Sequence, residues 1–276
     1  MIYGDIYSII PESILSGVSG IKSQFFLKCG KIYFKIFGYP DVASFGRFPK
    51  VLRMLNPQKN EKIFDAGCGN GIYANSIAYH FGSKMLGCDL DKKRIRIAQK
   101  IANYLKVDAK FSFGEIEKIN LPKNYFDKII CIEVIEHIKN DDLLIKKFNT
   151  LLKDNGALIL STAKKEELTE QEEQERFGKA EKGEHVRSGY ELSDLLKKIE
   201  NAGFKIVDWQ PFYRFFSKVA IKIQQKIYKR NLIFLNLLTF PLFLLIAKLD
   251  LFIPSKMKWN NNFGWYRGFI IKAIKE

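Results

Sequence analysis

The chain has 276 residues, of which 47% are hydrophobic, so it is long enough for one large domain or for a core domain with additions. Its formal net charge of +15 indicates a polyanionic partner or an anionic surface. The four cysteines have no metal-ligand spacing, and residues 1–11 contain an acid but no basic region, which argues against a secretory signal. We therefore expect a cytoplasmic protein with reduced thiols and no metal site.

The first part of the chain, residues 1–60, is predicted to be an N-terminal helical segment. The stretch Ile21–Phe37 is aromatic and basic and is a candidate helix. A break is expected at Tyr39-Pro40-Asp41, and a short helix at Phe48–Leu55. No internal repeat or low-complexity tract is present.

The stretch Ile63–Gly71 organises the rest of the chain. An apolar run ends at Asp65, three alternating glycines follow, and a periodic segment then reaches Phe81. This pattern predicts a buried strand at Lys62–Ala66, a tight turn, and a helix from Asn70. Glycines at such a turn let the backbone approach a ligand closely, and the start of the helix offers N–H groups and a partial positive charge. The turn is therefore expected to bind a nucleotide-like ligand.

The spacing of the glycines distinguishes between kinds of nucleotide. A dinucleotide-binding turn needs Gly-x-Gly-x-x-Gly, but here Ile72 stands at the position of the last glycine. A phosphate-binding loop needs Gly-Lys-Ser/Thr at its end, and this sequence does not have it. The pattern Asp-x-Gly-x-Gly-x-Gly resembles the first motif of the class I S-adenosylmethionine-dependent methyltransferases. The resemblance implies S-adenosylmethionine as cofactor, and an acid suits its cationic amino-acid end. An ordinary βαβ turn is the alternative. The implied cofactor-binding residues of this motif are Asp65, Gly67, Cys68, Gly69 and Gly71.

The next predicted strand, Lys84–Asp89, ends in a carboxylate about twenty residues after the glycines. This spacing is typical of an acid that accepts hydrogen bonds from both ribose hydroxyls, so Asp89 is assigned that role, with Leu90 beside it. Asp91 is instead a candidate cap for the helix predicted at Lys92–Tyr104.

A third strand is predicted at Ala109–Phe113. In the family that the motif resembles, an acid after this strand holds the adenine amino group and an apolar neighbour packs on the ring. Glu115 and Ile116 match these positions, although Glu115 is equally suited to a solvated loop.

The segment after the predicted strand Lys128–Ile132 is expected at the site, because ligands of open α/β sheets lie beyond the carboxyl ends of the strands. Ile132 and Glu133 are expected to contact the cofactor. His137 is a candidate base, because histidine titrates near neutrality; the alternative is a capping or buried hydrogen-bonded histidine.

A second motif follows the charged run Lys164–Glu184, for which a solvated helix or loop is expected. Many small-molecule methyltransferases show a similar Glu-His-x-Arg-x-x-Tyr before a helix that ends in Ala-Gly-Phe. The resemblance makes His185 and Arg187 candidate substrate-side residues, with a structural role in tying the loop to the sheet as the alternative. His137 and His185 are together the candidate catalytic residues. The remaining core elements are predicted at Asp141–Lys153, Ala157–Thr162, Glu191–Asn201 and Phe204–Phe212.

A long insertion separates the strand Phe204–Phe212 from the last predicted strand, Trp265–Ala273. In the resembling fold these two strands are usually joined by a short hairpin. The predicted segments are therefore residues 1–60 (helical), 61–210 (catalytic core), 211–263 (a basic, apolar cap) and 264–276 (final strand of the core).

The insertion begins with a basic amphipathic stretch, Tyr213–Arg230, which favours a membrane-surface helix. The uncharged stretch Asn231–Ala247 would be about 25 Å long as a helix, short of the roughly 30 Å needed to span a bilayer. We therefore expect an interfacial element, with a lid or a dimer interface as the alternatives. The basic positions at four-residue spacing are Arg214, Lys218, Lys222, Lys226 and Arg230.

These patterns lead to one hypothesis for the whole chain. We expect an α/β, Rossmann-like seven-stranded class I methyltransferase sheet with helices on both faces and a cap before the last strand. The acceptor is expected to be apolar or membrane-associated (a quinone, a lipid or a lipid-linked sugar), with the protein peripheral at the inner membrane face. The alternatives are a methyltransferase of a soluble metabolite, a non-catalytic membrane-surface protein with this fold, and, least favoured, a nucleic-acid methyltransferase.

Overall fold

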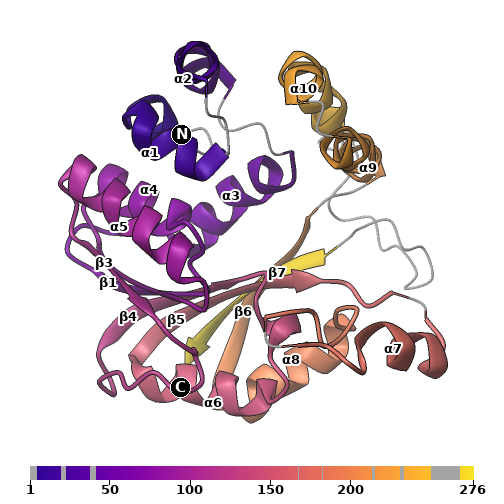
Figure 1. Ribbon diagram of the computed structural model, residues 1–276. Helices are drawn as coiled ribbons and strands as arrows, with labels where there is room; N and C mark the ends of the chain where they lie inside the picture. Colours follow the sequence, from indigo (N-terminus) through magenta and orange to yellow (C-terminus); the bar gives the residue numbers. More distant parts are fainter. Residues whose placement is uncertain are drawn as a thin grey trace.

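The computed structural model describes residues 5–19, 23–37, 42–166, 168–181, 183–212, 215–230, 233–249 and 268–276. The chain starts with helical elements and then alternates strands and helices (Figure 1). The helices are η1 (Asp5–Ser8), α1 (Glu12–Ser19), α2 (Gln24–Phe37), α3 (Val42–Leu55), α4 (Ile72–Phe81), α5 (Lys92–Leu105), η2 (Ile135–His137), α6 (Asp141–Leu151), α7 (Glu170–Phe177), α8 (Leu192–Asn201), α9 (Phe215–Lys229) and α10 (Ile233–Lys248). The strands are β1 (Lys62–Ala66), β2 (Lys84–Asp89), β3 (Ala109–Phe113), β4 (Phe126–Ile132), β5 (Leu152–Ala163), β6 (Phe204–Phe212) and β7 (Gly268–Lys275).

The strands form one sheet in the order β3-β2-β1-β4-β5-β7-β6. β7 is antiparallel to its neighbours β5 and β6, whereas the other neighbouring strands pair in parallel. This is the seven-stranded Rossmann-like sheet expected from the sequence, and the prediction of the fold class is confirmed. The carboxyl ends of β1, β2, β4 and β5 consequently meet at one edge, where open α/β sheets bind ligands.

Four strands begin and end where the sequence predicts, and three differ. β4 begins earlier, at Phe126, and β5 begins at Leu152 because α6 stops there and Leu152 turns extended to pair with Phe126. The last strand is Gly268–Lys275, and the predicted start at Trp265 lies outside the described residues. The pairing of Gly268 with both Ala163 and Phe212 sets the observed beginning of β7.

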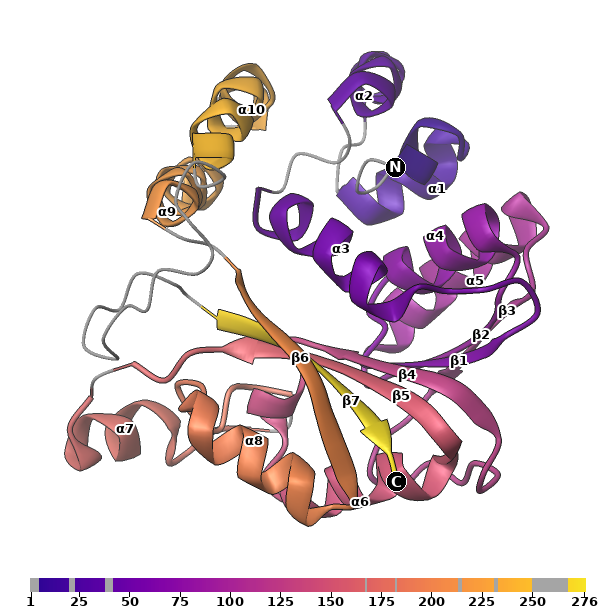
Figure 2. The same cartoon turned by 180° about the vertical axis from the view of Figure 1, so that it is seen from behind.

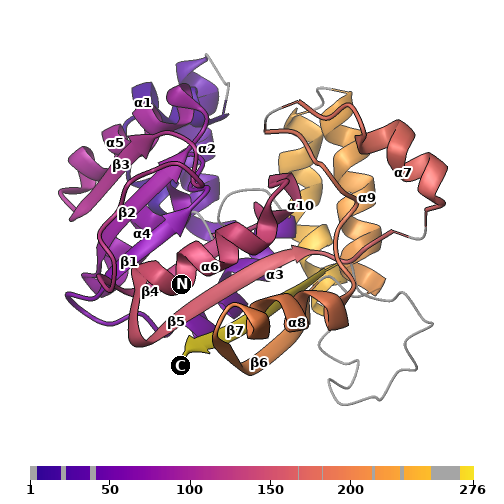
Figure 3. The same cartoon turned by 90° about the horizontal axis from the view of Figure 1, so that it is seen from below.

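Helices cover both faces of the sheet. Helices α3, α4 and α5 lie on one face, while α6 and α8 lie on the other, the side that Figure 3 views from below. Each face has its own buried apolar cluster. The charged run before His185 contains α7, which has no buried residue and begins with a capping box between Thr169 and Glu172.

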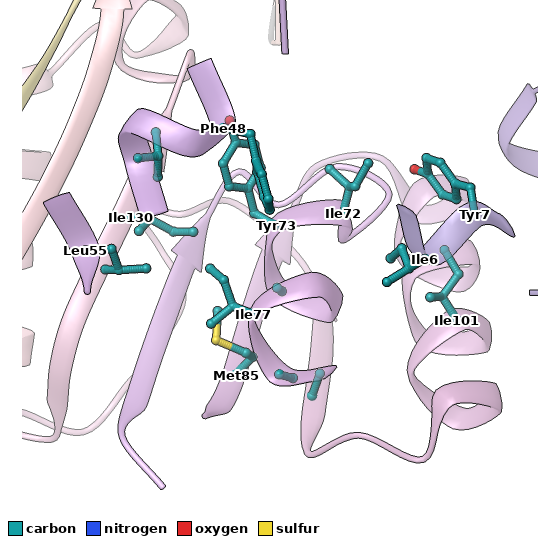
Figure 4. Packing of buried hydrophobic residues seen from close by; sticks show 14 of the residues in the cluster. Ile6, Tyr7, Phe48, Leu55, Ile72, Tyr73, Ile77, Met85, Ile101 and Ile130 are labelled. Atoms are coloured by element: carbon teal, nitrogen blue, oxygen red, sulfur yellow. The ribbon is translucent and has the colours of Figure 1, made fainter. Parts of the chain in front are cut away.

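The N-terminal helices pack on the face that carries α3 to α5 and extend its core. Figure 4 shows Ile6 and Tyr7 beside Ile101 of α5, and Phe48 of α3 beside Tyr73 of α4. The ring centroids of Phe48 and Tyr73 lie 4.8 Å apart, a tilted contact worth about 0.5–1.5 kcal/mol beyond area burial. α3 is therefore fixed against the helix that follows the glycine turn.

The insertion folds into α9 and α10, which pack on each other and on α3. Ala220, Ile221 and Phe240 are buried in the same apolar cluster as α3. A buried hydrogen bond from Gln224 Nε2 to Asn236 Oδ1 (2.9 Å) joins the two helices and satisfies two polar groups that would be costly to bury alone.

The predicted basic stripe is only partly described. Lys222 and Lys226 are exposed on α9, whereas Arg214 and the side chain of Lys218 lie outside the described residues. The helix buries Ala220 and Gln224, while Ile223 on its apolar side is exposed. Among the described residues, the helices are all too short or too polar to cross a membrane.

A polar network ties the loop before α8 to the start of α6. Arg187 donates to the Asp141 carboxylate and to the carbonyl oxygens of Ile138 and Lys139. Tyr190 Oη donates to Asp141 Oδ2 at 2.7 Å, and Lys198 pairs with Asp141 at 3.1 Å. The Asp141 side chain is only 7% exposed, so these partners stabilise a buried charge. Of the two roles expected for Arg187, this geometry matches the structural one.

Replacing Asp141 tests this network. Asp141→Ala leaves Arg187 and Tyr190 without their shared acceptor, and we expect the free energy of unfolding to fall by about 3 kcal/mol in urea titrations. Asp142→Ala is the matched control: it removes an exposed partner of the same Lys198, and the expected loss is below about 1 kcal/mol. Equal losses in the two variants would contradict the network as described.

Candidate active site

The turn after β1 requires glycine at two positions. Gly67 has φ = 80°, and a Cβ there would lie 2.2 Å from a methyl carbon of Val134, which follows β4. Gly71 has φ = 70°, and its Cβ would lie 2.7 Å from Cβ of Ala98 on α5. Both backbone angles are in the left-handed region that glycine adopts without strain. The turn is thus packed between the end of β4 and the middle of α5.

The backbone N–H groups of this turn are already used within the protein. Gly67 and Cys68 donate to the carbonyl oxygen of Cys88 at 2.8 and 3.0 Å. Gly69 donates to Asp89 Oδ2 at 2.8 Å, and Gly71 donates to the Cys68 carbonyl at 2.8 Å. A phosphate site would need such donors free. These four N–H groups are therefore not free to bind a phosphate, which is consistent with the interpretation of the glycine spacing.

Asp65, at the end of β1, is an acceptor without a full set of partners. It is 3% exposed, and its Oδ2 has no hydrogen-bond partner among the described residues. Burial and then the nearby Asp89 carboxylate raise the pKa of Asp65 to about 8, against an opposing hydrogen bond with the Ala74 backbone. Asn70 Oδ1 is likewise buried without a partner in the described part of the chain. Two orphaned acceptors beside the turn fit a positively charged ligand group.

Asp89 is held in place at the end of β2. Its Oδ2 accepts from the Gly69 N–H, and its Oδ1 accepts from the Asp91 N–H at 2.9 Å. Each carboxylate oxygen has a further lone pair, so the group remains able to accept from two hydroxyls. Leu90 beside it is partly buried. Asp91 caps α5 through Lys93 and Arg94, as the sequence indicated.

The loop after β3 lies beside Asp89, because the Gly114 N–H donates to the Asp89 carbonyl at 3.0 Å. Glu115 in this loop pairs with Lys118 at 3.0 Å. Ile116 is 5% exposed and belongs to the core on the α6 face, so it offers little surface to a ligand. Cys68 is 7% exposed, and burial raises the pKa of its thiol well above the usual range, so it stays a neutral packing group.

The end of β4 is held by contacts from both sides. Ile132 is partly buried, and Glu133 follows it with φ = 56°, an unusual angle for a residue other than glycine. Ser161 Oγ of β5 donates to Glu133 Oε1 at 3.0 Å, and Arg47 of α3 pairs with Oε2 at 3.1 Å. The Arg47 guanidinium also lies 5.7 Å from the ring of Phe212, where β6 ends. These contacts keep a strained backbone in place, a feature common at functional sites.

His137 and His185, far apart in sequence, lie together. Their ring centroids are 4.2 Å apart, and the buried carboxyl of Glu136 accepts from Thr162 Oγ1 at 3.0 Å next to them. Burial first, and then His185, lower the pKa of His137, against hydrogen bonds with the backbone of Glu184 and Gly183. His137 Nδ1 has no hydrogen-bond partner among the described residues. His137 is therefore neutral near pH 7 and offers a lone pair.

The same three side chains also form a candidate set of metal ligands. One ligand atom each from Glu136, His137 and His185 lies within 4.8 Å of the others. Imidazole nitrogens and a carboxylate oxygen are suitable ligands for a divalent cation. The sequence led us to expect no metal site, because His185 is brought to Glu136 only by the fold: the Val186 N–H donates to the Glu136 carbonyl at 3.0 Å.

Three residues at this edge were not predicted. Glu136 was missed although it stands next to His137, and Ser161 and Thr162 were missed because the strand β5 gave no motif. Tyr73 of α4 was also missed: it is buried, and the neighbouring Arg47 opposes the effect of burial, which raises the pKa of its hydroxyl. Arg47 of α3 reaches the same edge through its pairing with Glu133.

The comparisons with known proteins agree with this geometry. A family model described as a methyltransferase domain matches residues 57–229, so the chain belongs to this methyltransferase family.

The chain is also similar to individual proteins of known name. The ubiquinone biosynthesis O-methyltransferase of Pelagibacter ubique (strain HTCC1062) is 37% identical over 118 residues, which are 42% of this chain and 48% of that protein. The chain thus spans about half the length of the curated relatives that it matches.

Solved structures support the fold alone at their low identity. The phosphoethanolamine N-methyltransferase 2 of Haemonchus contortus, in complex with S-adenosyl-L-methionine, has a TM-score of 0.61 at 17% identity, with 93% of this chain and 60% of that chain covered. A putative sarcosine dimethylglycine methyltransferase from Galdieria sulphuraria has a TM-score of 0.62 at 15% identity, with 90% and 97% covered.

The residues present fit S-adenosylmethionine. The orphaned oxygen of Asp65 suits its cationic amino-acid end, and Asp89 can accept from its ribose. When bound, the cofactor supplies a methyl group activated by a sulfonium centre. We expect Asp65, Gly67 and Asp89 to bind the cofactor. Glu133 and Glu115 are expected to lie beside it.

The ribose assignment predicts a loss of affinity. Asp89→Ala should weaken S-adenosylmethionine binding by about 1–3 kcal/mol in isothermal titration, because two hydroxyls lose their acceptor. Asp91→Ala is the control, since it removes the α5 cap two residues away and should leave the affinity unchanged. Unchanged affinity in Asp89→Ala would show that the ribose lies elsewhere.

The raised pKa of Asp65 predicts a pH dependence. The free carboxyl is mostly protonated at about pH 7, and a cation beside it favours the ionised form, so binding should release a proton. The affinity should rise by up to about tenfold per pH unit below the pKa and level off above about pH 8. Titration in two buffers of different ionisation enthalpy measures the proton. Asp65→Asn should remove both the proton release and the slope; a slope that persists would assign it to another group.

Proposed function

We propose that the protein methylates a hydroxyl oxygen of an apolar acceptor, such as a quinol, a lipid or a lipid-linked sugar. The observation that carries this proposal is the position of His137, a neutral imidazole with an unpaired Nδ1 at the carboxyl end of β4, directly after the residues that contact the glycine turn. A hydroxyl nucleophile must lose its proton as it is methylated, whereas a neutral amine can attack before its proton leaves. A base at this edge therefore favours oxygen as the acceptor atom.

The residues around His137 suit proton removal. Its lowered pKa favours the unprotonated ring, and a nitrogen of that ring would take the proton from the acceptor hydroxyl. Burial and then the neighbouring Glu133 raise the pKa of Glu136, so this carboxyl is held in a weakly ionised state beside the ring. It can stabilise the imidazolium once that forms. The remaining task of the protein is to hold the two reactants in line and to exclude water.

The apolar character of the acceptor is supported by the cap and by the relatives. The insertion leaves the sheet at Phe212, the carboxyl end of β6, which is the edge where the site lies. Its two helices bring an apolar surface to that edge and contact α3, which carries Arg47. The curated relatives are named ubiquinone biosynthesis O-methyltransferases, which supports a quinone-type acceptor here.

A soluble acceptor is the second candidate, and a specific observation favours it. The buried side of the cap is well packed, with Phe240 fully buried and the Gln224–Asn236 hydrogen bond in its interior, as in a lid that closes over a small molecule. Under this alternative the protein acts in the cytoplasm on a metabolite. Under the favoured proposal it works peripherally at the inner membrane face.

Labelled methyl transfer separates the two candidates. The protein with methyl-labelled S-adenosylmethionine is incubated with a total lipid extract and, separately, with the water-soluble metabolite fraction of the same cells. We expect label in the lipid extract, on a product that resists hydrolysis as an ether does. Label in the soluble fraction alone would replace the proposal with the soluble candidate.

The base assignment predicts a loss of turnover without a loss of binding. In the fraction that accepts label, His137→Ala should lower kcat by about a hundredfold or more and leave the Kd of S-adenosylmethionine unchanged. The wild-type rate should fall only below the ordinary histidine pKa, because burial lowers the pKa of His137. His80→Ala, at the far end of α4, is the matched histidine control. Loss of transfer on dialysis against a chelator, with recovery on adding a divalent cation, would contradict the base role and favour metal ligation by His137.

A further inference from the structure

α10 presents a second apolar side that the protein does not bury. Leucines recur at three- and four-residue spacing along this side, so they form one stripe on the helix. The opposite side is buried through Phe240 and Phe243. The exposed fractions in this stripe are 39% for Leu235, 68% for Leu238, 55% for Leu242 and 61% for Leu245.

α2, near the other end of the chain, carries a matching stripe. Phe25, Ile32 and Ile36 are 70%, 67% and 57% exposed, and Cys29 is exposed between them. The same helix turns Leu27 into the protein, so its packing side is separate from the stripe. Large apolar side chains scattered singly on a surface are ordinary, but two regular stripes indicate a binding surface.

The two helices that carry these stripes lie in the same layer of the molecule. Figures 1 and 2, seen from opposite sides, both place α2 and α10 beyond α3, as the outermost helices on the face of the sheet that α3 to α5 cover. α9 adds Val219 and Ile223, which are 39% and 42% exposed. A broad flat partner is therefore able to contact all three helices.

The charges beside the stripes have one sign. Lys28 and Lys35 of α2 and Lys222 and Lys226 of α9 are exposed. None of the three helices contains an aspartate or glutamate. The opposite side of the sheet differs, because α7 has exposed glutamates in its first turn and no buried residue. The combination of exposed leucines with lysines and without acids is typical of helices that lie in the interface of an anionic membrane.

We propose that α2, α9 and α10 form a docking surface for an anionic lipid bilayer. A second copy of the chain fits less well, because it would bring lysines against lysines with no acid on these helices to pair with them. α10 has 16 residues, about 24 Å, so it lies in the interface rather than crossing the roughly 30 Å hydrocarbon core. The docking itself is independent of the methyl acceptor; only delivery of the acceptor from the membrane rests on the function proposed above.

Flotation with vesicles tests the surface. The full chain is floated with vesicles of phosphatidylcholine mixed with phosphatidylglycerol and with vesicles of phosphatidylcholine alone. We expect binding to the mixed vesicles, weakened by salt. One variant combines Phe25→Ser, Ile32→Ser and Ile36→Ser on α2, and a second combines Leu238→Ser, Leu242→Ser and Leu245→Ser on α10. Each should lower the partition coefficient by at least about tenfold, because the substituted side chains no longer enter the apolar layer.

Two controls keep the test specific. Leu143→Ser removes a leucine that is 64% exposed on α6, on the other face of the sheet, and should leave flotation unchanged. The double variant Lys92→Gln/Lys93→Gln removes two exposed charges of α5, which lies outside the docking surface. The double variant Lys222→Gln/Lys226→Gln has the same net charge but removes its two charges from the docking surface, so it should reduce flotation more. Equal effects inside and outside the surface would overturn the proposal.

A fluorescent probe on the α2 stripe gives an independent measure. Cys29 is exposed, whereas Cys68, Cys88 and Cys131 are buried, so an environment-sensitive thiol dye should label Cys29 selectively. Its emission should shift to the blue on addition of mixed vesicles. The same dye on Leu143→Cys in a Cys29→Ser background should not shift. A blue shift at both positions, or at neither, would overturn the assignment of the surface.

The outcomes separate docking from catalysis. The α2 variant should still bind S-adenosylmethionine and transfer label to a detergent-solubilised lipid extract, while failing to float. If the unmodified protein floats with the mixed vesicles but transfers no label to the lipid extract, the proposed function is contradicted. The docking surface is still supported in that case. If sedimentation instead shows a dimer that the α10 variant dissociates, with no flotation, the surface is a self-interface and the proposal fails.

Discussion

The burial of Asp65 is the constraint on which the site depends. The carboxyl is 3% exposed, and one of its oxygens has no hydrogen-bond partner in the described part of the chain, so burial and Asp89 together raise its pKa to about 8. A carboxylate buried in this way costs stability unless a positive charge arrives. The N–H groups of Gly67, Cys68 and Gly69 in the neighbouring turn already donate to Cys88 and Asp89, whereas Asp65 Oδ2 is an acceptor that a ligand can use. A cationic cofactor end satisfies both conditions at once.

Much of the fold follows from short patterns that act locally. The strands β1, β2, β3 and β6 were predicted at their observed bounds: β1 and β3 end directly before a glycine, β2 ends in an acid, and β6 follows a helix that stops at Ala-Gly. The glycines of the first motif imply left-handed backbone angles, and Gly67 and Gly71 have them. Asp91 as the cap of α5 followed from its position alone. The family assignment rests on these local features.

The parts that escaped prediction depend on contacts between distant segments. The pairing of Arg47 with Glu133 joins residues that are separated by several elements, and no spacing in the sequence indicates it. The contact of His137 with His185 likewise depends on the network that binds Arg187 to Asp141. On α9, the amphipathic pattern did not indicate which side packs on the protein; the buried Gln224–Asn236 hydrogen bond lies on that side, and Ile223 is exposed. A polar residue decided which side of the helix packs, which a hydrophobicity pattern does not foresee.

The place of β7 has a consequence for the order of folding. β7 follows the cap in the chain, yet it lies between β5 and β6 and is the strand with which β6 pairs. During synthesis, α9 and α10 therefore emerge while β5 still has an open edge and β6 has no neighbour in the sheet. Closing the loop from Phe212 to Gly268 costs chain entropy that only the completed pairing recovers. The nascent protein consequently presents an unpaired strand edge together with apolar cap helices, a state in which it depends on early burial or on a chaperone to avoid aggregation.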